Sequence, residues 1–84
     1  MSSAKYYEIK GKITECDEII QEAKNTKSRL KNEVLNALNE PLNYDLLFGL
    51  ISGLKSADTT ITKTKKDLEI YNLALEAIKK DEEC

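Results

Sequence analysis

The sequence predicts an all-α fold: an antiparallel helical hairpin that completes a four-helix bundle with a partner chain. Two runs of heptad-spaced apolar residues flank the only proline, Pro41, and this spacing keeps one narrow seam facing a neighbouring helix. Proline lacks a backbone N–H and is tolerated only in the first turn of a helix, so Pro41 separates the two runs. A chain that is 40% hydrophobic and 33% charged, with three glycines, is also typical of long helices.

The first helix is predicted over residues 4–38. Its seam residues alternate in spacing between three and four positions: Tyr6, Ile9, Ile13, Cys16, Ile20, Ala23, Lys27, Leu30, Val34 and Ala37. Lys27 is the one charged residue of this seam, and the antiparallel alignment places Asp58 beside it. We therefore expect Lys27 to set the register of the two helices and to have no catalytic role.

The turn is predicted over residues 39–43 and the second helix over residues 44–80. Asn43 is expected to cap this helix, and Asp45 to complement the positive end of its dipole. The same alternation of spacings defines its seam: Leu47, Leu50, Leu54, Ala57, Ile61, Thr64, Leu68, Tyr71, Leu75 and Ile78. A break near Ser56 is the alternative to one continuous helix. One continuous helix is favoured because Leu54, Ala57 and Ile61 keep the alternating spacing of three and four across this region.

The last four residues, 81–84, are predicted to form a frayed acidic tail, so that residues 1–84 make a single helical-hairpin domain. Folding back at the turn places Cys16 opposite Leu68 and Ile9 opposite Leu75. Small residues then meet large ones repeatedly, as close-packed antiparallel helices require.

The chain carries more apolar residues than a two-helix seam uses, and the excess forms two groups. The larger group surrounds the turn: Leu35, Leu38, Leu42, Leu46, Phe48 and Ile51. A weaker second group lies at the opposite end of the hairpin: Tyr7, Ile70, Leu73 and Ala77. Gly49, Gly53 and Ala57 recur every four residues and leave a strip where another helix could approach closely. We expect this surface to bind a helical partner, because contiguous exposed apolar patches mark association sites. The predicted partner-binding residues are Leu38, Leu42, Leu46, Phe48, Gly49, Ile51 and Gly53. The alternative is that the turn folds over these side chains and buries them.

No catalytic, cofactor or metal site is expected, so the chain is predicted not to be an enzyme. Histidine is absent, which removes the usual general base and the commonest metal ligand. The two cysteines form no disulfide framework or paired metal motif. A net charge of -2 gives no basic field for nucleic acid. No segment approaches the ~20 apolar residues of a membrane span, and no signal peptide is recognisable, so we expect a cytoplasmic protein without a small-molecule ligand.

Leu47-Phe48-Gly49, following Pro41 near the middle of the chain, resembles the Trp-x-Gly element of the WxG-type small proteins of type VII secretion. The chain is also similar to the small helical partners of LxG toxins. The resemblance implies a helical hairpin whose turn region packs against a helical partner. Families of this kind often carry a C-terminal Tyr-x-x-x-Asp/Glu export signal, whereas Leu75 stands four residues after Tyr71 here.

The resemblance therefore implies a partner or targeting protein that binds the helical region of a type VII-secreted toxin and assists its stability and export as a chaperone. The expected partner is the N-terminal region of such a toxin or a second small helical protein. Export of the chain in complex with the toxin belongs to the same expectation. The alternative function is a homodimeric helical adaptor or inhibitor that acts by protein–protein binding.

Overall fold

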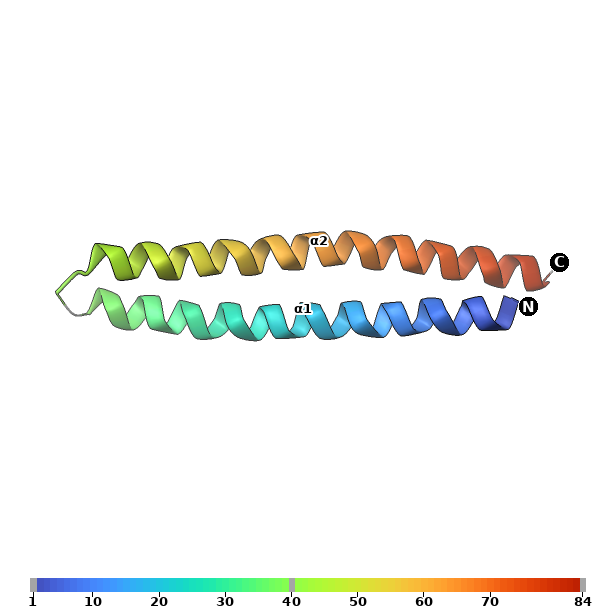
Figure 1. The fold of residues 1–84 in the computed structure, drawn as a ribbon, viewed down its shortest axis with the longest axis horizontal. Coiled ribbons are helices and arrows are strands. Elements are labelled where there is room, and N and C mark those ends of the chain that lie inside the picture. Colours follow the sequence, from blue (N-terminus) through green and yellow to red (C-terminus); the bar gives the residue numbers. More distant parts are fainter. Residues whose placement is uncertain (1, 40, 84) are drawn as a thin grey trace.

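The computed structural model describes residues 2–39 and 41–83, which form two long helices lying side by side and antiparallel (Figure 1). Helix α1 spans Ser2–Leu38 and helix α2 spans Tyr44–Glu83. Together they make a rod of 66 × 14 × 14 Å. The predicted all-α hairpin is confirmed, and its completion to a four-helix bundle stays a prediction.

The start of α2 is fixed by the predicted cap. The Leu46 backbone N–H donates to Asn43 Oδ1 at 3.1 Å, and the Leu47 N–H donates to the Asn43 carbonyl oxygen at 3.0 Å. The side-chain bond satisfies one of the N–H groups that have no partner within the helix. Asp45 in the first turn adds a favourable charge next to the positive end of the helix dipole.

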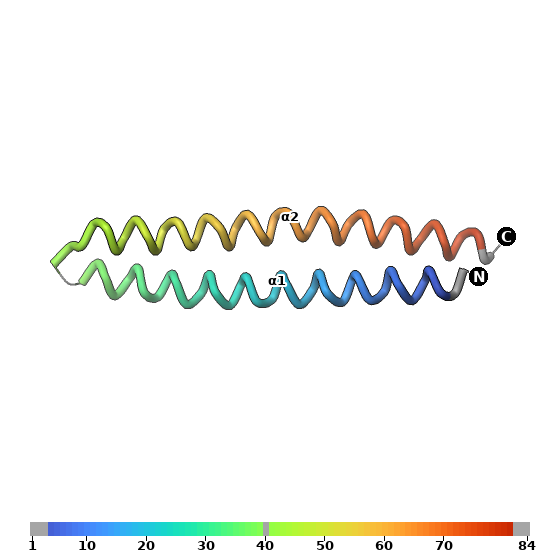
Figure 2. The backbone as a smooth tube through the Cα atoms, in the orientation of Figure 1, coloured from blue at the N-terminus to red at the C-terminus, as the bar shows by residue number. Residues whose placement is uncertain are grey.

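The last turn of α1 is tightened by a 3₁₀-type hydrogen bond, which spans three residues instead of four. The Asn39 N–H donates it to the Asn36 carbonyl oxygen at 3.1 Å. Pro41 lies in the connecting segment, outside both helices, where its missing N–H costs no helical hydrogen bond. The chain reverses there, and Figure 2 shows the two backbones staying together from the turn to the opposite end. We call that opposite end the open end.

Both helices extend past their predicted limits. Helix α1 begins at Ser2 instead of residue 4, and α2 continues beyond Lys80 to Glu83. Three of the four residues predicted as a frayed tail are thus helical, while Cys84 lies outside the described residues. No glycine or proline follows Lys80, so none of the next three residues breaks the helix.

Helix α2 is continuous through the region where a break was the alternative. Its β-branched residues are accommodated there, and the Thr59 hydroxyl donates to the Lys55 carbonyl oxygen at 2.9 Å. That bond satisfies the hydroxyl within the helix itself, as threonines in helix interiors commonly do.

The core is the predicted seam. Every seam position of both helices is buried or half-buried. The buried side chains are Ile9, Cys16, Ile20, Ala23, Leu47, Ala57 and Thr64. No described side chain is less than 2% exposed, because two helices cannot enclose a residue from all sides. The heptad pattern therefore located the core correctly, and that core is thin.

Four further residues are half-buried: Thr26, Gly53, Asp67 and Ala74. Each directly precedes a seam residue, so all four lie along the same edge of the seam. The helices are therefore packed more closely along this edge than along the other.

Candidate protein-interaction surface

The apolar residues around the turn are exposed to solvent. We call them the turn patch, and its members are Leu35, Leu38, Leu42, Tyr44, Leu46, Phe48 and Ile51. Their exposed fractions run from 48% for Leu42 to 66% for Phe48. The alternative in which the turn covers these side chains is not what the chain adopts. Large apolar side chains gathered at one end of a rod are a typical association surface.

Five of the seven predicted partner-binding residues, all of the leucines, Phe48 and Ile51, belong to this patch. Gly49 is also exposed, and a Cβ added to it would meet nothing within 4 Å. A neighbouring helix could therefore approach the backbone at Gly49 without obstruction from this chain.

Gly53 is placed differently from Gly49. It is half-buried, and a Cβ built on it would lie 2.9 Å from Leu30 Cδ1 of α1. The missing side chain therefore makes room for α1 of the same chain. Ala57, one turn further on, is likewise buried in the seam. Of the predicted strip of small residues, only Gly49 stays open for a partner.

Shallow grooves run along both sides of the seam, and their linings differ. One side is lined by small, mostly uncharged residues from both helices. We call it the small-residue face: Ile19, Glu22, Ala23, Thr26, Gly53, Ser56, Ala57 and Thr60. The other side is rich in lysine, and we call it the basic face: Lys24, Lys27, Ser28, Lys31, Asp58, Ile61, Thr62 and Lys65.

Most of the turn patch continues the basic face. Leu35 and Leu38 follow Ser28 and Lys31 by one heptad, and Ile51 precedes Asp58 by one heptad. Tyr44 and Phe48 precede Asp58 and Thr62 by two heptads. Residues a heptad apart project in nearly the same direction, so five large apolar side chains and the lysines share one side of the rod.

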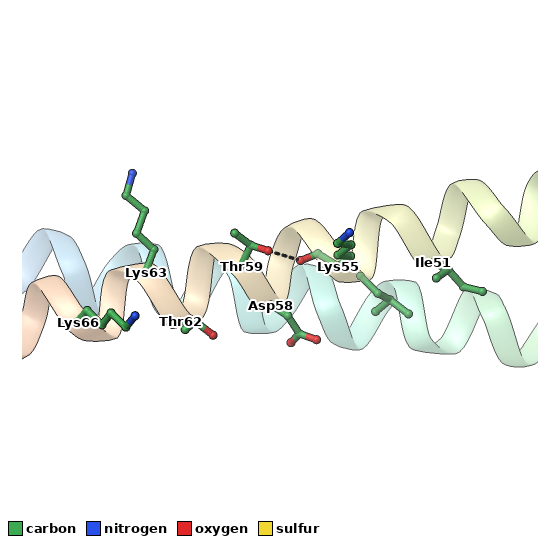
Figure 3. A pocket seen from close by; sticks show the side chains of 8 residues that line it. Ile51, Lys55, Asp58, Thr59, Thr62, Lys63 and Lys66 are labelled. Atoms are coloured by element: carbon green, nitrogen blue, oxygen red, sulfur yellow. Dashed lines mark hydrogen bonds between the residues drawn. The ribbon is translucent and has the colours of Figure 1, made fainter.

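A groove on α2 joins the two parts of this surface. It has Ile51 at one end and continues past Lys55, Asp58 and Thr62 to Lys66 (Figure 3). All of its lining residues come from α2, so the surface is a shallow helix face and not an enclosed cavity. Such a surface suits a second helix better than a small molecule.

The predicted seam ion pair is present. Lys27 Nζ lies 2.6 Å from Asp58 Oδ1, with the two side chains 37% and 57% exposed. This contact confirms the antiparallel register that was expected from the sequence. Because both groups remain partly hydrated, the pair adds at most about 1 kcal/mol to stability and acts mainly by fixing alignment.

Cys16 shows no sign of a reactive site. Its side chain is buried in the seam. Burial raises the pKa of the Cys16 thiol, and the nearby carboxylate of Asp67 raises it further. A neutral, covered thiol is a poor nucleophile and a poor metal ligand, so Cys16 serves as a small core residue.

Within the described part of the chain, neither helix has the apolar length needed to cross a bilayer. Among the same residues, no three His, Cys, Asp or Glu side chains gather closely enough to hold a metal ion.

Tyr44 is the member of this surface that the sequence reasoning missed. It is 63% exposed beside the turn. Its heptad spacing from Ile51 and Asp58 was the available signal, and it places all three on one side of α2. The sequence reasoning also treated the lysines as general solvent-exposed charge and did not separate the two faces.

No family model, no curated protein and no solved structure matches this chain. The fold and the surface together define its class: an all-α, coiled-coil-like helical hairpin with an exposed apolar end.

Proposed function

We propose that this hairpin is a protein-interaction module that binds a helical segment of another protein through its turn patch. The observation that carries the proposal is the exposure of the patch, in which Phe48 and Leu35 are 66% and 61% exposed. A thin two-helix core leaves the hairpin itself with little stability to spare. Covering the patch would therefore stabilise this chain and its partner together.

In its more specific form, the proposal is that the partner is the helical region of a type VII-secreted toxin, which this chain stabilises and accompanies toward export. The support is the position of Leu47-Phe48-Gly49 at the start of α2. Leu47, which stands in the place of tryptophan, is buried in the seam, while Phe48 and Gly49 are exposed. Phe48 and Gly49 are thus available to a partner helix, whereas Leu47 is not.

The test compares two aspartate substitutions on α2. Phe48 and Leu73 are both 66% exposed, but only Phe48 lies in the turn patch. We expect Phe48→Asp to abolish association while preserving helicity, and Leu73→Asp to change neither. Light scattering gives the mass of the chain alone and mixed with the helical N-terminal region of an LxG toxin, and circular dichroism gives the helicity.

The proposed partner function predicts a poorly defined oligomer for the chain alone and a one-to-one complex with the toxin region. A sharp, stable homodimer that ignores the toxin region would favour the adaptor or inhibitor function. A monomer at millimolar concentration, whose behaviour is unchanged by Phe48→Asp, would contradict association through the turn patch altogether.

A further inference from the structure

We infer that the helix which covers the turn patch also lies along the basic face and carries acidic residues there. The partner would thus be an amphipathic helix with large apolar residues at one end and Asp or Glu about four helical turns further on, the separation of Ile51 and Lys65 along α2. This inference rests on the proposed function, and adds to it the partner's chemistry and direction.

The first support is the continuity of the surface. The basic face runs from the turn patch toward the open end, and its lysines come from both helices. The groove that begins at Ile51 passes Lys55 and ends at Lys66 (Figure 3). A straight helix packed on the turn patch and following the rod would therefore lie over these lysines.

The second support is that the charge of this face is not balanced by the chain. Asp58 is the one acidic residue that lines the groove between the helices, and it is paired with Lys27. Among the described residues, Lys24, Lys31, Lys55 and Lys65 form no ion pair. A partner carrying carboxylates would be attracted to the face, and a basic partner would be repelled.

The small-residue face lacks this property. Glu22 is the only charged residue in its central lining, which otherwise consists of small or apolar residues. A helix packed there would meet no excess of positive charge. Selection for acidic residues therefore distinguishes the two faces.

A second copy of this chain fits the basic face poorly. In a parallel pairing, the lysines of one copy would face the lysines of the other. In an antiparallel pairing, the basic face would meet the open end of the same face, which by heptad spacing carries Lys10 and Lys79 as well as Asp17, Glu69 and Glu76. Lysines interspersed with these carboxylates complement the basic face less well than a uniformly acidic helix would, so the occupant we commit to is a different, acidic helix.

The experiment selects partners without assuming their identity. The full chain serves as bait for a displayed library of amphipathic helices about four heptads long, in which the apolar seam is fixed and the flanking positions are free to be Glu or Lys. We expect selected helices to be enriched in Glu toward one end. Their binding should weaken as salt is raised from about 0.05 to 0.5 M.

Charge reversal on the bait provides the matched control. In the first variant Lys24, Lys31 and Lys65 are all changed to Glu. In the second variant Lys5, Lys12 and Lys80 are changed to Glu, because they line neither the basic face nor the groove of Figure 3. The two variants have equal net charge. We expect the first to bind the Glu-rich helices about tenfold more weakly and to select Lys-rich ones instead, and the second to resemble the unaltered chain. Circular dichroism confirms that both variants fold.

The outcomes separate this inference from the proposed function. If the selected helices need Phe48 of the chain for binding but show no preference for Glu at their free positions, the inference is overturned and the proposed function stands. An equal loss of affinity for the Glu-rich helices in the two charge variants would also overturn the inference, because net charge alone would then explain the effect. If no helix is selected, or if the chain binds only vesicles containing phosphatidylserine, both the inference and the proposed function fail.

Discussion

Lys27 brings a charge into a seam that is otherwise uncharged. Its ammonium group lies 2.6 Å from Asp58 Oδ1 in a partly hydrated position. A pair of this kind contributes little net energy, since desolvation offsets most of the attraction. Its value lies in specificity, because any shift of the two helices along each other would separate the charges.

We predict that Lys27→Leu raises the free energy of unfolding by about 1 kcal/mol, because an apolar side chain is better suited to the seam. The same change should also produce more than one oligomeric state, since the register is no longer specified. Urea unfolding and light scattering measure the two effects. Asp58→Asn is the control, with an expected loss below about 1 kcal/mol. A loss of several kcal/mol in Lys27→Leu would show that the pair stabilises the fold directly.

Cys16 couples stability to pH. Its thiol is buried, which raises its pKa in the folded state, with a smaller contribution from Asp67. In the unfolded chain the thiol ionises near its ordinary pKa of about 8.5. Folding therefore favours the neutral thiol. Its contribution to the free energy of unfolding is fully present below about pH 8.5 and is lost as the pH rises through the raised pKa of the folded state.

We therefore predict that the urea midpoint falls above about pH 8.5 in a Cys84→Ser background, and that adding Cys16→Ala makes the fall shallower. Thiol labelling of Cys16 in the folded chain should also be slow relative to labelling in urea. If the urea midpoints of the two proteins depend on pH in the same way, groups other than Cys16 cause the fall in stability.

At the scale of the helices, α2 distinguishes two glycines that stand four residues apart. Gly53 is covered by Leu30 of α1, whereas Gly49 has open space around it. Glycine lowers helix stability at both places by about 0.5–1 kcal/mol relative to alanine. At Gly53 the close approach of the two helices offsets this cost within the chain. At Gly49 no contact of the described residues does so.

Leucine at these two positions should have opposite consequences. We predict that Gly53→Leu forces the helices apart and lowers the free energy of unfolding by about 1–3 kcal/mol. Gly49→Leu should leave helicity intact and reduce association with a partner. Thermal unfolding followed by circular dichroism, together with light scattering, provides both measurements. If Gly49→Leu associates normally, the partner does not approach α2 at that point.

The whole molecule is a rod 66 Å long and 14 Å wide with one layer of contacts between its helices. No described side chain is enclosed on all sides, so each seam residue contributes a large share of the stability. Exposed apolar side chains at the turn meanwhile contribute nothing to the fold of the single chain. Folding and association therefore depend on different residues.

We predict that Leu68→Asp unfolds the chain, because it places a carboxylate in the seam opposite Cys16, where hydration is restricted. Far-UV circular dichroism at micromolar concentration should show loss of most helical signal. Leu73→Asp, at a position 66% exposed on the same helix, should retain it. Native helicity in Leu68→Asp would mean that the seam around Cys16 is dispensable for folding.

The sequence alone determined both helices, the cap at Asn43, the register marked by Lys27 and Asp58, and the line of core residues. These features follow from local rules: heptad spacing gives each side chain a direction on its own helix, and a proline between two such runs permits only a turn. The exposure of Phe48 and Ile51 followed for the same reason, since neither lies in the seam.

Only the tertiary structure decided which helix packs against each small residue and how the two sides of the rod differ. Gly53 was predicted to admit a partner, but it admits Leu30 of its own chain, while Gly49 stays open. A glycine has no side chain whose character reveals what lies beside it. The answer depends on how far each helix is rotated toward the other, and that rotation is set by the packing of both helices together.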